Sequence, residues 1–359
     1  MALGPAAYDI VIGDGLLTQL SETLSAACPA ARYAVIADAT VAEKFGRAVL
    51  EAADRVAPSD LFTFPAGERN KTAEQWQALS ERLLAAGLGR DGAVVALGGG
   101  VSGDLAGFVA ATYMRGVPYI QIPTTLLAMI DSSIGGKTGV DTAHGKNLIG
   151  AFHQPRAVVA DVTTLGELPP VHFAAGMAEA LKHGAIADRG YVDWIERDRQ
   201  AILARDTEAL VELVRRSVQI KAAVVAEDER ETGKRAILNF GHTVAHAIEA
   251  ASGYEVLHGE AVAMGMVAEA QLGTRIGVTE AGTSEALREA LISFNLPTDP
   301  PEKSPAHLLE AMQRDKKVRE GSVRFALLKR VGEPARRNTD NWTFEVPERE
   351  IISVLGPRI

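Results

Sequence analysis

Short apolar runs alternate with helical patterns through residues 8–160, and this alternation limits the possible folds more than any other feature. The runs are bounded by turn residues and fall at 8–12, 33–37, 60–64, 93–97, 119–122 and 157–160. Amphipathic stretches such as 72–86 lie between them. Strands that alternate with helices form βαβ units, and such units build a parallel sheet. The sequence therefore predicts an N-terminal α/β domain that is Rossmann-like, with a mostly parallel sheet.

The pattern changes after Pro169 and Pro170, where long helical segments such as 206–227 become dominant. It also favours a late hairpin at 316–329, because Glu320 and Gly321 are typical of a hairpin turn. We expect two domains, residues 1–170 and residues 171–359, the second mainly α-helical. We expect the active site in the interdomain cleft.

Composition excludes several classes of function. The chain has 359 residues, 47% hydrophobic and 5% aromatic, which is typical of a soluble globular protein with two domains. Its formal net charge of −9 disfavours nucleic acid or an anionic membrane as a main partner, although a local cationic pocket for a small anion stays open. The single cysteine, Cys28, excludes an internal disulfide framework. The first residues lack the pattern of a signal peptide, and no run of about 18 apolar residues occurs. We expect a cytoplasmic protein.

Three histidines lie close together in the sequence. His246 follows His242 by one helical turn, and His258 comes after a short connection, so that their three imidazoles can converge. Converging imidazoles bind metal or move protons, but a histidine pair at this spacing also occurs as hydrogen-bonded core or surface residues. Gly241 and Gly259 flank the outer histidines, which suits close backbone approach, and the next helix, 260–271, is almost wholly apolar. The context favours a buried functional site.

A glycine-rich turn follows the predicted strand at 93–97. Its sequence is GGGVSGD, from Gly98 to Asp104, and a helical pattern comes next. Bare N–H groups at a helix N-terminus bind phosphate or pyrophosphate, and ligands of parallel sheets bind at the carboxyl ends of the strands. Tight strand-to-helix turns also use glycine without a ligand, and the spacing differs from G-x-G-x-x-G. A nucleotide site is the favoured interpretation.

Two lysines stand beside glycines in the segment 115–154. Lys137 follows Gly135 and Gly136, and Lys146 follows Gly145. A lysine in this setting is better placed to bind an anion than one on a solvated helix face, although most lysines are solvent-exposed and inert. We expect an anionic ligand near both.

The chain resembles the 3-dehydroquinate synthase family, which belongs to the sugar-phosphate cyclases. The resemblance extends in order from about residue 8 to 328. Its motifs are GGGVSGDLAGF from residue 98, YMRG from 113, IPTTLLA from 122, DSSIGGKTGV from 131, GKNLIGAF from 145, GMAEALK from 176, NFGHT from 239 and LHGEAV from 257. Ser102 and Ala245 depart from the family pattern, at positions between those that carry chemistry.

The resemblance implies a lyase that uses NAD and a divalent metal, zinc or cobalt. The family converts 3-deoxy-D-arabino-heptulosonate 7-phosphate into 3-dehydroquinate and phosphate, in the shikimate pathway to chorismate and the aromatic amino acids. NAD oxidises the C5 hydroxyl transiently, phosphate is eliminated, the ketone is reduced again, and the ring reopens and closes by an intramolecular aldol step. Residues 1–170 would bind NAD, and residues 171–359 the metal and substrate.

The resemblance also implies roles for individual residues. The metal ligands would be Glu179, His242 and His258, and His246 would transfer protons. Contacts to substrate carboxylate and phosphate would come from Lys137, Lys146, Lys182, Lys221, Arg235, Asn147, Asn239 and one of Lys316 and Lys317. The family forms homodimers, in which Arg115 would serve the neighbouring subunit's site.

The cofactor residues implied by the resemblance all precede residue 165. They are Asp38, Glu68, Lys71, Gly99, Gly100, Val101, Ser102, Gly103, Asp104, Thr124, Thr125, Asp131, Lys137, Lys146 and Thr164. Asp38 ends a predicted strand, where an acidic side chain accepts hydrogen bonds from ribose hydroxyls and favours NAD over its 2′-phosphorylated form.

Three alternatives stay open at this stage. Other sugar-phosphate cyclases make valiolone-, inosose- or gadusol-type rings with the same cofactors, but Lys221, Arg235 and Asn239 suit a substrate that carries a carboxylate. Related metal-dependent polyol dehydrogenases consume their cofactor and would accumulate NADH. The third alternative is a binding protein without catalytic activity.

Overall fold

The computed structural model describes residues 1–301, 305–314, 323–339 and 341–356. Its contacts divide the chain into two compact units. Unit 1 consists of Met1–Pro169 and Arg205–Val218, and unit 2 consists of Pro170–Ala204 and the chain from Gln219 onward. The 205–218 segment thus belongs with the N-terminal part of the chain, although it follows Pro170 in sequence.

A six-stranded parallel sheet forms the centre of unit 1, which confirms the predicted fold class. Its order is β1-β8-β5-β4-β2-β3. The strands are β1 (Asp9–Gly13), β2 (Tyr33–Asp38), β3 (Ser59–Phe64), β4 (Ala93–Gly98), β5 (Tyr119–Pro123) and β8 (Ala157–Asp161). Each of the six predicted runs corresponds to one of these strands.

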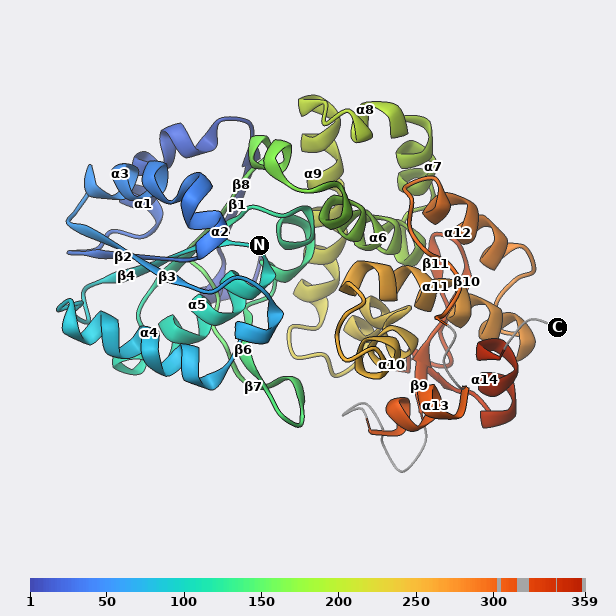
Figure 1. Cartoon of the computed structure of the whole chain (residues 1–359). Helices are drawn as coiled ribbons and strands as arrows, with labels where there is room; N and C mark the ends of the chain where they lie inside the picture. The colour runs from blue at the N-terminus through green and yellow to red at the C-terminus, as the bar shows by residue number, and fades with distance from the viewer. Residues whose placement is uncertain (302–304, 315–322, 340, 357–359) are drawn as a thin grey trace. The chain divides into compact units, whose positions relative to one another are not determined.

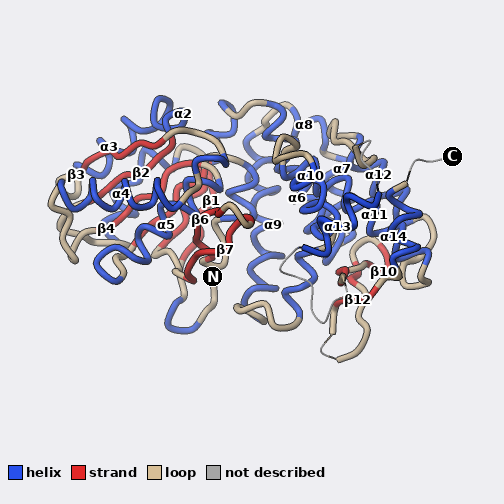
Figure 2. The backbone as a smooth tube through the Cα atoms, turned by 60° about the horizontal axis from the view of Figure 1, so that its bottom comes forward, coloured by secondary structure: helices blue, strands red, loops and turns tan. Residues whose placement is uncertain are grey.

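Helices cover both faces of this sheet (Figures 1 and 2). They are α1 (Leu20–Ala27), α2 (Ala39–Val41), α3 (Arg47–Asp54), α4 (Ala73–Ala85) and α5 (Gly100–Thr112). Because side chains alternate along a strand, Ala34 and Ile36 of β2 pack with α4 and α5, whereas Tyr33, Val35 and Ala37 pack with α1 and α3. Both faces of the central strands are therefore buried, and the strands read as continuous apolar runs.

A β-hairpin that the sequence pattern did not predict follows the sheet strand β5. It consists of β6 (Lys137–Thr142) and β7 (Gly145–Phe152), which pair antiparallel, and β6 packs against α5. Gly139 and Gly150 face each other across the ladder, and a Cβ at Gly150 would lie 2.1 Å from the carbonyl oxygen of Thr138. These glycines allow the two strands to approach but interrupt the apolar alternation by which strands are recognised.

Unit 2 is mainly helical, as predicted (Figure 2). Its helices are α6 (Pro170–Ala187), α7 (Arg189–Arg197), α8 (Arg199–Leu203), α10 (His242–Ala251), α11 (His258–Arg275), α12 (Thr283–Ile292), α13 (Pro305–Arg314) and α14 (Glu348–Leu355). The apolar helix α11 packs against α6, α10, α12 and α14, and thirteen of its residues, which include Val262, Met266 and Leu272, are buried. It is the central helix of this unit.

The late hairpin predicted at 316–329 is only partly within the described residues, because its turn at 320–321 lies outside them. The described part forms two short strands with other partners. Strand β9 (Arg324–Ala326) pairs with β12 (Thr343–Glu345), and β10 (Leu328–Arg330) pairs with β11 (Glu333–Pro334). The other half of the predicted hairpin, 316–319, also lies outside the described residues, so the predicted pairing stays a prediction.

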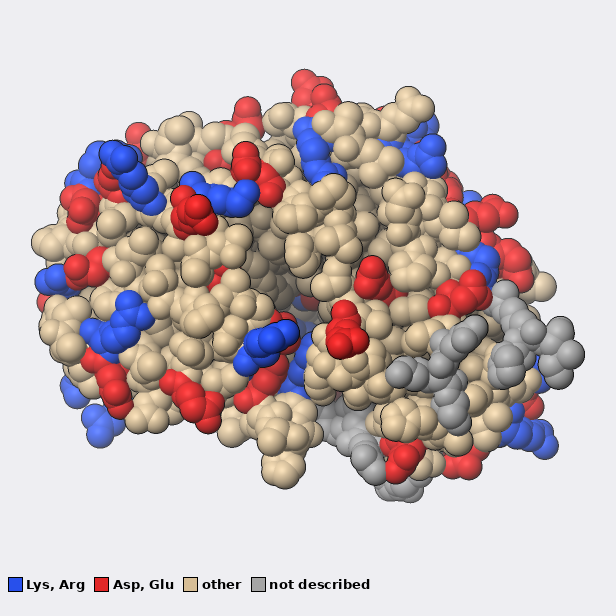
Figure 3. All heavy atoms as spheres, viewed as in Figure 1, with Lys and Arg blue, Asp and Glu red and all other residues tan. Residues whose placement is uncertain are grey.

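One long helix, α9 (Thr207–Glu227), is shared between the units. Its residues up to Val218 belong to unit 1, and those from Gln219 belong to unit 2. Within the described part of the chain, no helix has both the length and the apolar character needed to cross a membrane. Acidic and basic side chains are interspersed over the face seen in Figure 3.

Candidate active site

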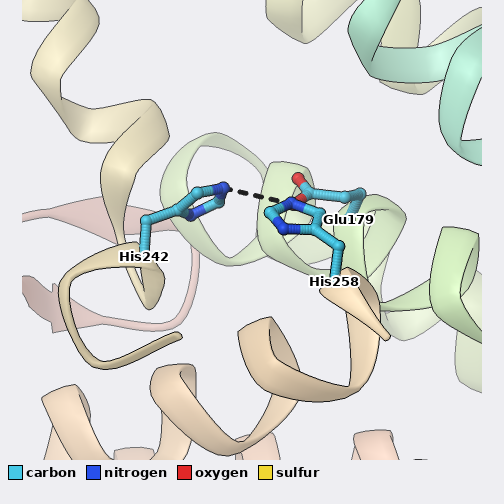
Figure 4. Close-up of side chains that lie close together, drawn as sticks. All are labelled: Glu179, His242 and His258. Atoms are coloured by element: carbon cyan, nitrogen blue, oxygen red, sulfur yellow. Dashed lines mark ion pairs between the residues drawn. The ribbon is translucent and has the colours of Figure 1, made fainter. Parts of the chain in front are cut away.

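Three helices of unit 2 bring Glu179, His242 and His258 together (Figure 4). Glu179 lies within α6, whereas His242 and His258 are the first residues of α10 and α11. The Nε2 atoms of His242 and His258 lie 3.5 and 3.4 Å from Oε1 of Glu179. The three potential ligand atoms all lie within 4.8 Å of one another. One carboxylate and two imidazoles are a typical ligand set for catalytic zinc.

The two oxygens of the Glu179 carboxylate have different partners. Oε1 faces the two histidines, and Oε2 forms an ion pair with the ammonium group of Lys182, one turn later on α6. The side chain of Glu179 is fully buried and that of Lys182 is 2% exposed. A buried carboxylate is costly unless cationic or hydrogen-bonding groups compensate for its lost hydration, and Lys182 supplies such a charge.

His242 and His246 lie on neighbouring turns of α10, as their spacing predicts. Their ring centroids are 5.7 Å apart in an edge-to-face arrangement, and the rings of His242 and His258 are 5.3 Å apart. The Nδ1 atom of His242 lies 3.2 Å from the carbonyl oxygen of Phe240, which directs Nε2 toward Glu179. The ring of His242 is therefore a neighbour of both other imidazoles, and the group of potential ligands contains Glu179 in place of His246.

His258 lies between two carboxylates. Its Nε2 faces Glu179, and its Nδ1 lies 3.5 Å from Oε2 of Glu249. Burial lowers the pKa of His258, but the interactions with Glu179 and Glu249 outweigh this effect and raise the pKa to about 10. The two carboxylates thus favour positive charge at this position, which a divalent cation would also supply.

Glycines let the three ligand-bearing helices approach one another closely. A Cβ at Gly259 would lie 2.1 Å from the carbonyl oxygen of Ala175, which precedes Glu179 by one turn of α6. A Cβ at Gly265 would lie 2.0 Å from the carbonyl oxygen of Gly241, the residue before His242. Helix α11 thus meets α6 and α10 backbone to backbone. The predicted close approach at Gly241 and Gly259 is present in the structure.

Two buried carboxylates beside the histidines were not predicted from the sequence. Glu269 of α11 is fully buried and accepts hydrogen bonds from the N–H groups of Gly241 (2.7 Å) and Val244 (3.1 Å). It thereby caps the start of α10, where no local side chain does so. Glu249, beside His258, is 2% exposed. The available sequence signal was a glutamate within an otherwise apolar helix.

The polar residues between α9 and α10 form a connected loop. The carboxylate of Asp228 accepts hydrogen bonds from the N–H groups of Thr232, Gly233 and Arg235. The guanidinium of Arg235, a 3% exposed residue, donates to the carbonyl of Glu229. These bonds hold the backbone and side chain of Arg235 within one compact turn.

Asn239 and Lys221, the other polar residues predicted to bind substrate, flank this loop. Asn239 donates through Nδ2 to Oε1 of Glu231, at 2.6 Å. Lys221 belongs to the part of α9 in unit 2 and is 6% exposed. Both Asn239 and Arg235 therefore donate hydrogen bonds to oxygen atoms of this loop.

The glycine-rich turn of unit 1 connects β4 to α5, as predicted. Gly98 has φ +143°, and a Cβ there would lie 2.4 Å from Oγ of Ser102. Asp38 ends the adjacent strand β2, accepts the N–H groups of Thr40 and Val41, and accepts Oγ–H of Ser102 at 3.2 Å. The turn and the acidic residue thus lie side by side at the carboxyl edge of the sheet, where nucleotides bind in such folds.

A second group of charged residues lies beside the start of α5. The ammonium group of Lys71 is 2.7 Å from Oδ2 of Asp104 and 3.6 Å from Oε1 of Glu68, and Lys146 is 3.8 Å from the same Glu68 oxygen. Burial lowers the pKa of Lys71, but Asp104, Glu68 and Asp141 outweigh it and raise the pKa above its ordinary value. Four residues that the resemblance implies as ligands therefore form one network.

Asp141 links this network to the hairpin. Its N–H donates to the carbonyl of Lys71 (2.7 Å), and its Oδ1 accepts the N–H of Asn147 (2.8 Å), which has φ +55°. Burial raises the pKa of Asp141, and Lys71 opposes this effect. Asp141 thus fixes the start of β7, which carries Lys146 and Asn147.

The remaining predicted residues have varied settings. Thr124 is buried and its N–H donates to the carbonyl of Gly98, while Oγ1 of Thr125 accepts the N–H of Ala128. Val101 and Gly103 lie within α5, and Arg115 follows this helix with φ +70°. Asp131 lies in a π-helical turn, and Oγ1 of Thr164 donates to the carbonyl of Asp161. Lys137 is exposed at the start of β6. Lys316 and Lys317 lie outside the described residues.

The fold and these groups define a class of protein. A glycine turn on a central parallel strand and a carboxylate with two imidazoles are typical of enzymes that combine a nucleotide cofactor with a divalent metal. Residues 61–175 match the family described as 3-dehydroquinate synthase N-terminal, and residues 176–318 match 3-dehydroquinate synthase C-terminal. The chain belongs to the 3-dehydroquinate synthase family.

Relatives of this family cover nearly the whole chain. A 3-dehydroquinate synthase of Symbiobacterium thermophilum is 49% identical over 337 residues, 93% of this chain and 94% of that protein. One of Syntrophotalea carbinolica is 46% identical over 335 residues, 93% of this chain and 92% of the relative. Sequence similarity at this level and coverage identifies the family without relying on single motifs.

Solved structures with the same fold include other sugar-phosphate cyclases. A 2-deoxy-scyllo-inosose synthase complexed with carbaglucose-6-phosphate, NAD⁺ and Co²⁺ has a TM-score of 0.89 at 30% identity, with 97% of this chain and 96% of that chain covered. A 2-epi-5-epi-valiolone synthase from Streptomyces hygroscopicus subsp. jinggangensis 5008, with NAD⁺ and Zn²⁺ bound, has a TM-score of 0.88 at 29% identity, with 99% and 97% covered. Both belong to the reaction types that the sequence left as alternatives.

Proposed function

We propose that this chain converts 3-deoxy-D-arabino-heptulosonate 7-phosphate into 3-dehydroquinate and inorganic phosphate, as a lyase of the shikimate pathway. The observation that carries the proposal is 46–49% identity over at least 93% of the chain to proteins named 3-dehydroquinate synthase. The inosose and valiolone synthases are 29–30% identical. The site residues give this assignment a chemical basis.

Glu179, His242 and His258 would hold one divalent ion, zinc or cobalt. Their ligand atoms already lie within 4.8 Å of one another. The buried carboxylate of Glu179 contacts the ammonium group of Lys182 and the two imidazoles, which can be protonated. The residues therefore fit a divalent cation. When bound, such an ion supplies Lewis-acid chemistry that lowers the pKa of a substrate hydroxyl and polarises a carbonyl.

The residues around the β4–α5 turn would hold NAD. Because Gly98 has no side chain, the cofactor can approach the backbone of the turn closely. The carboxylate of Asp38 beside it is suited to accept hydrogen bonds from ribose hydroxyls. Glu68, Lys71 and Asp104 would support the cofactor from the charged network. When bound, NAD supplies a reversible hydride acceptor for the C5 hydroxyl, so that net consumption of cofactor is zero.

The protein's own side chains bind and orient the substrate and move its protons. His246 would transfer a proton at the reacting hydroxyl, with its ring on the turn after His242. A carboxylate and a phosphate removed from water need several charge-assisted donors, which Lys182, Lys221, Arg235 and Asn239 would supply. Lys137, Lys146 and Asn147, on the hairpin of unit 1, would add further donors.

Phosphate release measured together with product formation tests the proposal. Purified chain with NAD, zinc or cobalt and the heptulosonate phosphate should release one phosphate for each 3-dehydroquinate formed, with no accumulation of NADH at 340 nm. Glucose 6-phosphate, which lacks the carboxylate, should be a poor substrate, because Arg235 and Asn239 would then lack their anionic partner. Turnover of glucose 6-phosphate in preference to the heptulosonate phosphate would assign the chain to another cyclase type, and stoichiometric NADH would assign it to the dehydrogenases.

We further propose that the chain acts as a homodimer. Strand β7 carries the exposed apolar side chains Leu148, Ile149 and Phe152, and in the described part of the chain β7 pairs only with β6. An exposed apolar edge strand is suited to pairing with a second copy. Arg115 would serve the partner's site, and its φ of +70° is a strained conformation that favours a functional role over a purely structural one.

Mixing of inactive variants tests the shared site. Arg115→Ala and Lys182→Ala chains should each be inactive alone, and a mixed dimer should regain activity at the one site that receives both native side chains. Mixed dimers verified by mass spectrometry that show no activity above either parent would place Arg115 at its own chain's site or in the fold alone.

We also propose a cytoplasmic location. The chain has a single cysteine, Cys28, which is buried and cannot form a disulfide within the chain, and such cysteine usage fits a reducing compartment. Fractionation of the cells that produce the chain, followed by immunodetection, is the direct test.

A further inference from the structure

Glu249 lies directly behind one of the three proposed metal ligands. It is located near the end of α10, is 2% exposed, and places Oε2 3.5 Å from Nδ1 of His258. His258 begins the next helix, α11. A carboxylate on one helix thus contacts the first residue of the following helix on the side away from Glu179.

The imidazole of His258 needs this contact for a chemical reason. Its Nε2 faces the Glu179 carboxylate at 3.4 Å, so Nε2 is the nitrogen available to a metal ion at this group. Nδ1 then carries the ring proton and requires an acceptor. An acceptor on Nδ1 fixes the tautomer, holds the ring orientation and makes Nε2 a stronger electron donor.

The two histidines of the group differ in this support. Nδ1 of His242 lies near the neutral carbonyl oxygen of Phe240, at 3.2 Å, whereas Nδ1 of His258 faces an anionic carboxylate. The backbone also anchors Glu249, because its carbonyl oxygen accepts the N–H of Tyr254 (2.8 Å) and Oγ–H of Ser252 (3.0 Å). The turn that ends α10 therefore holds Glu249 in place beside the connection to His258.

We propose that Glu249 is a positioning residue, which acts through His258 and thereby sets the affinity of the metal centre for a divalent cation. This inference rests on the proposed function of Glu179, His242 and His258 as ligands. Loss of such a carboxylate partner typically weakens metal binding by roughly 10- to 100-fold. Glu249→Ala, which removes both charge and acceptor, should show the full loss, and Glu249→Gln, which keeps an acceptor oxygen, should show a smaller one.

Metal binding by the purified full chain, without substrate, tests the proposal. Dissociation constants for Zn²⁺ and Co²⁺ are measured by competition with a chromophoric chelator, and the visible absorption of the Co²⁺ form reports the ligand geometry. Glu255→Gln serves as the control, because Glu255 is exposed and the substitution removes the same charge from the neighbouring loop. Thermal unfolding of each metal-free variant reports whether the fold is retained.

The expected result is a 10- to 100-fold weaker affinity in Glu249→Ala, an intermediate affinity in Glu249→Gln, an altered Co²⁺ spectrum, and native binding in Glu255→Gln. Native affinity and spectrum in both Glu249 variants would overturn the role of Glu249 and leave the metal centre intact. If Glu249→Ala does not fold, Glu249→Gln decides the question by the same measurements. Failure of the unsubstituted chain to bind either ion would instead refute the metal centre itself.

Discussion

Substitution of Gly259 by alanine should disrupt the metal centre without changing any proposed ligand. Gly259 follows His258 at the start of α11, and its Cα packs against the backbone of α6 at Ala175, one turn before Glu179. The added Cβ would lie 2.1 Å from the carbonyl oxygen, 2.4 Å from Cα and 2.5 Å from the carbonyl carbon of Ala175. All three atoms belong to the backbone, so a side-chain rotation cannot relieve the clash.

The size of the effect follows from these contacts. Ordinary contacts of a Cβ begin at 3.4 Å, so the start of α11 has to move away from α6 by about 1 Å. Overpacking of this kind costs about 1–3 kcal/mol of folding free energy. Metal–ligand distances tolerate deviations of only about 0.2 Å, so a displacement of His258 relative to Glu179 should weaken zinc binding by at least about tenfold.

Two measurements separate these consequences. Chelator competition gives the zinc affinity of the Gly259→Ala chain, and thermal unfolding of the metal-free form gives its stability. Gly166→Ala is the matched control, because a Cβ at Gly166 meets no atom within 4 Å. The reasoning is refuted if Gly259→Ala folds and binds zinc with native affinity, since the helix contact would then not determine the ligand geometry.

Three further predictions concern other parts of the site. His246→Ala should keep the native metal content but lose roughly 10²- to 10⁴-fold in kcat, and loss of metal together with activity would make His246 a ligand. Gly98→Ala should weaken NAD binding by at least about tenfold in a fluorescence titration. The substitution combines backbone strain at φ +143° with a Cβ 2.4 Å from Oγ of Ser102. An unchanged affinity would contradict a cofactor role for this turn. Asp141→Ala should raise KM for the heptulosonate phosphate about tenfold, since the N–H of Asn147 loses a charge-assisted hydrogen bond worth roughly 1.5 kcal/mol. A change confined to kcat would refute a role of Asp141 in substrate binding.

The sheet of unit 1 could be predicted because its strands are buried on both faces. Val94 and Ala96 of β4 face one core and Val95 and Leu97 face the other, so the strand is an uninterrupted apolar run. The hairpin of β6 and β7 escaped prediction for the opposite reason. Its close strand contacts depend on Gly139 and Gly150, and β7, which is largely exposed and contains two glycines, carries little periodic signal.

The candidate site was predictable to a different degree in its different parts. Helical spacing predicted that His242 and His246 are neighbours, and the flanking glycines favoured the approach of His258. Glu179 was identified only through the family resemblance. Glu249 and Glu269 were missed, because a glutamate in a helix is ordinarily taken for a solvated side chain. Their burial depends on how α6, α10 and α11 pack, and that packing is a tertiary property without a local pattern.

The shared helix α9 has a consequence for the order in which the chain can fold during synthesis. Unit 1 contains Arg205–Val218 as well as Met1–Pro169, so its parts are complete only after the whole insertion, Pro170–Ala204, has been translated. At about 5–20 residues per second, the ribosome needs roughly 2 to 10 s to pass from Pro169 to Val218. During this interval the nascent sheet lacks a helical segment of its own unit, and a fragment that ends at Pro169 lacks it permanently. Chimaeras between homologues should therefore exchange Met1–Pro169 together with Arg205–Val218, since a single junction at Pro169 leaves unit 1 with the Arg205–Val218 segment of the other homologue.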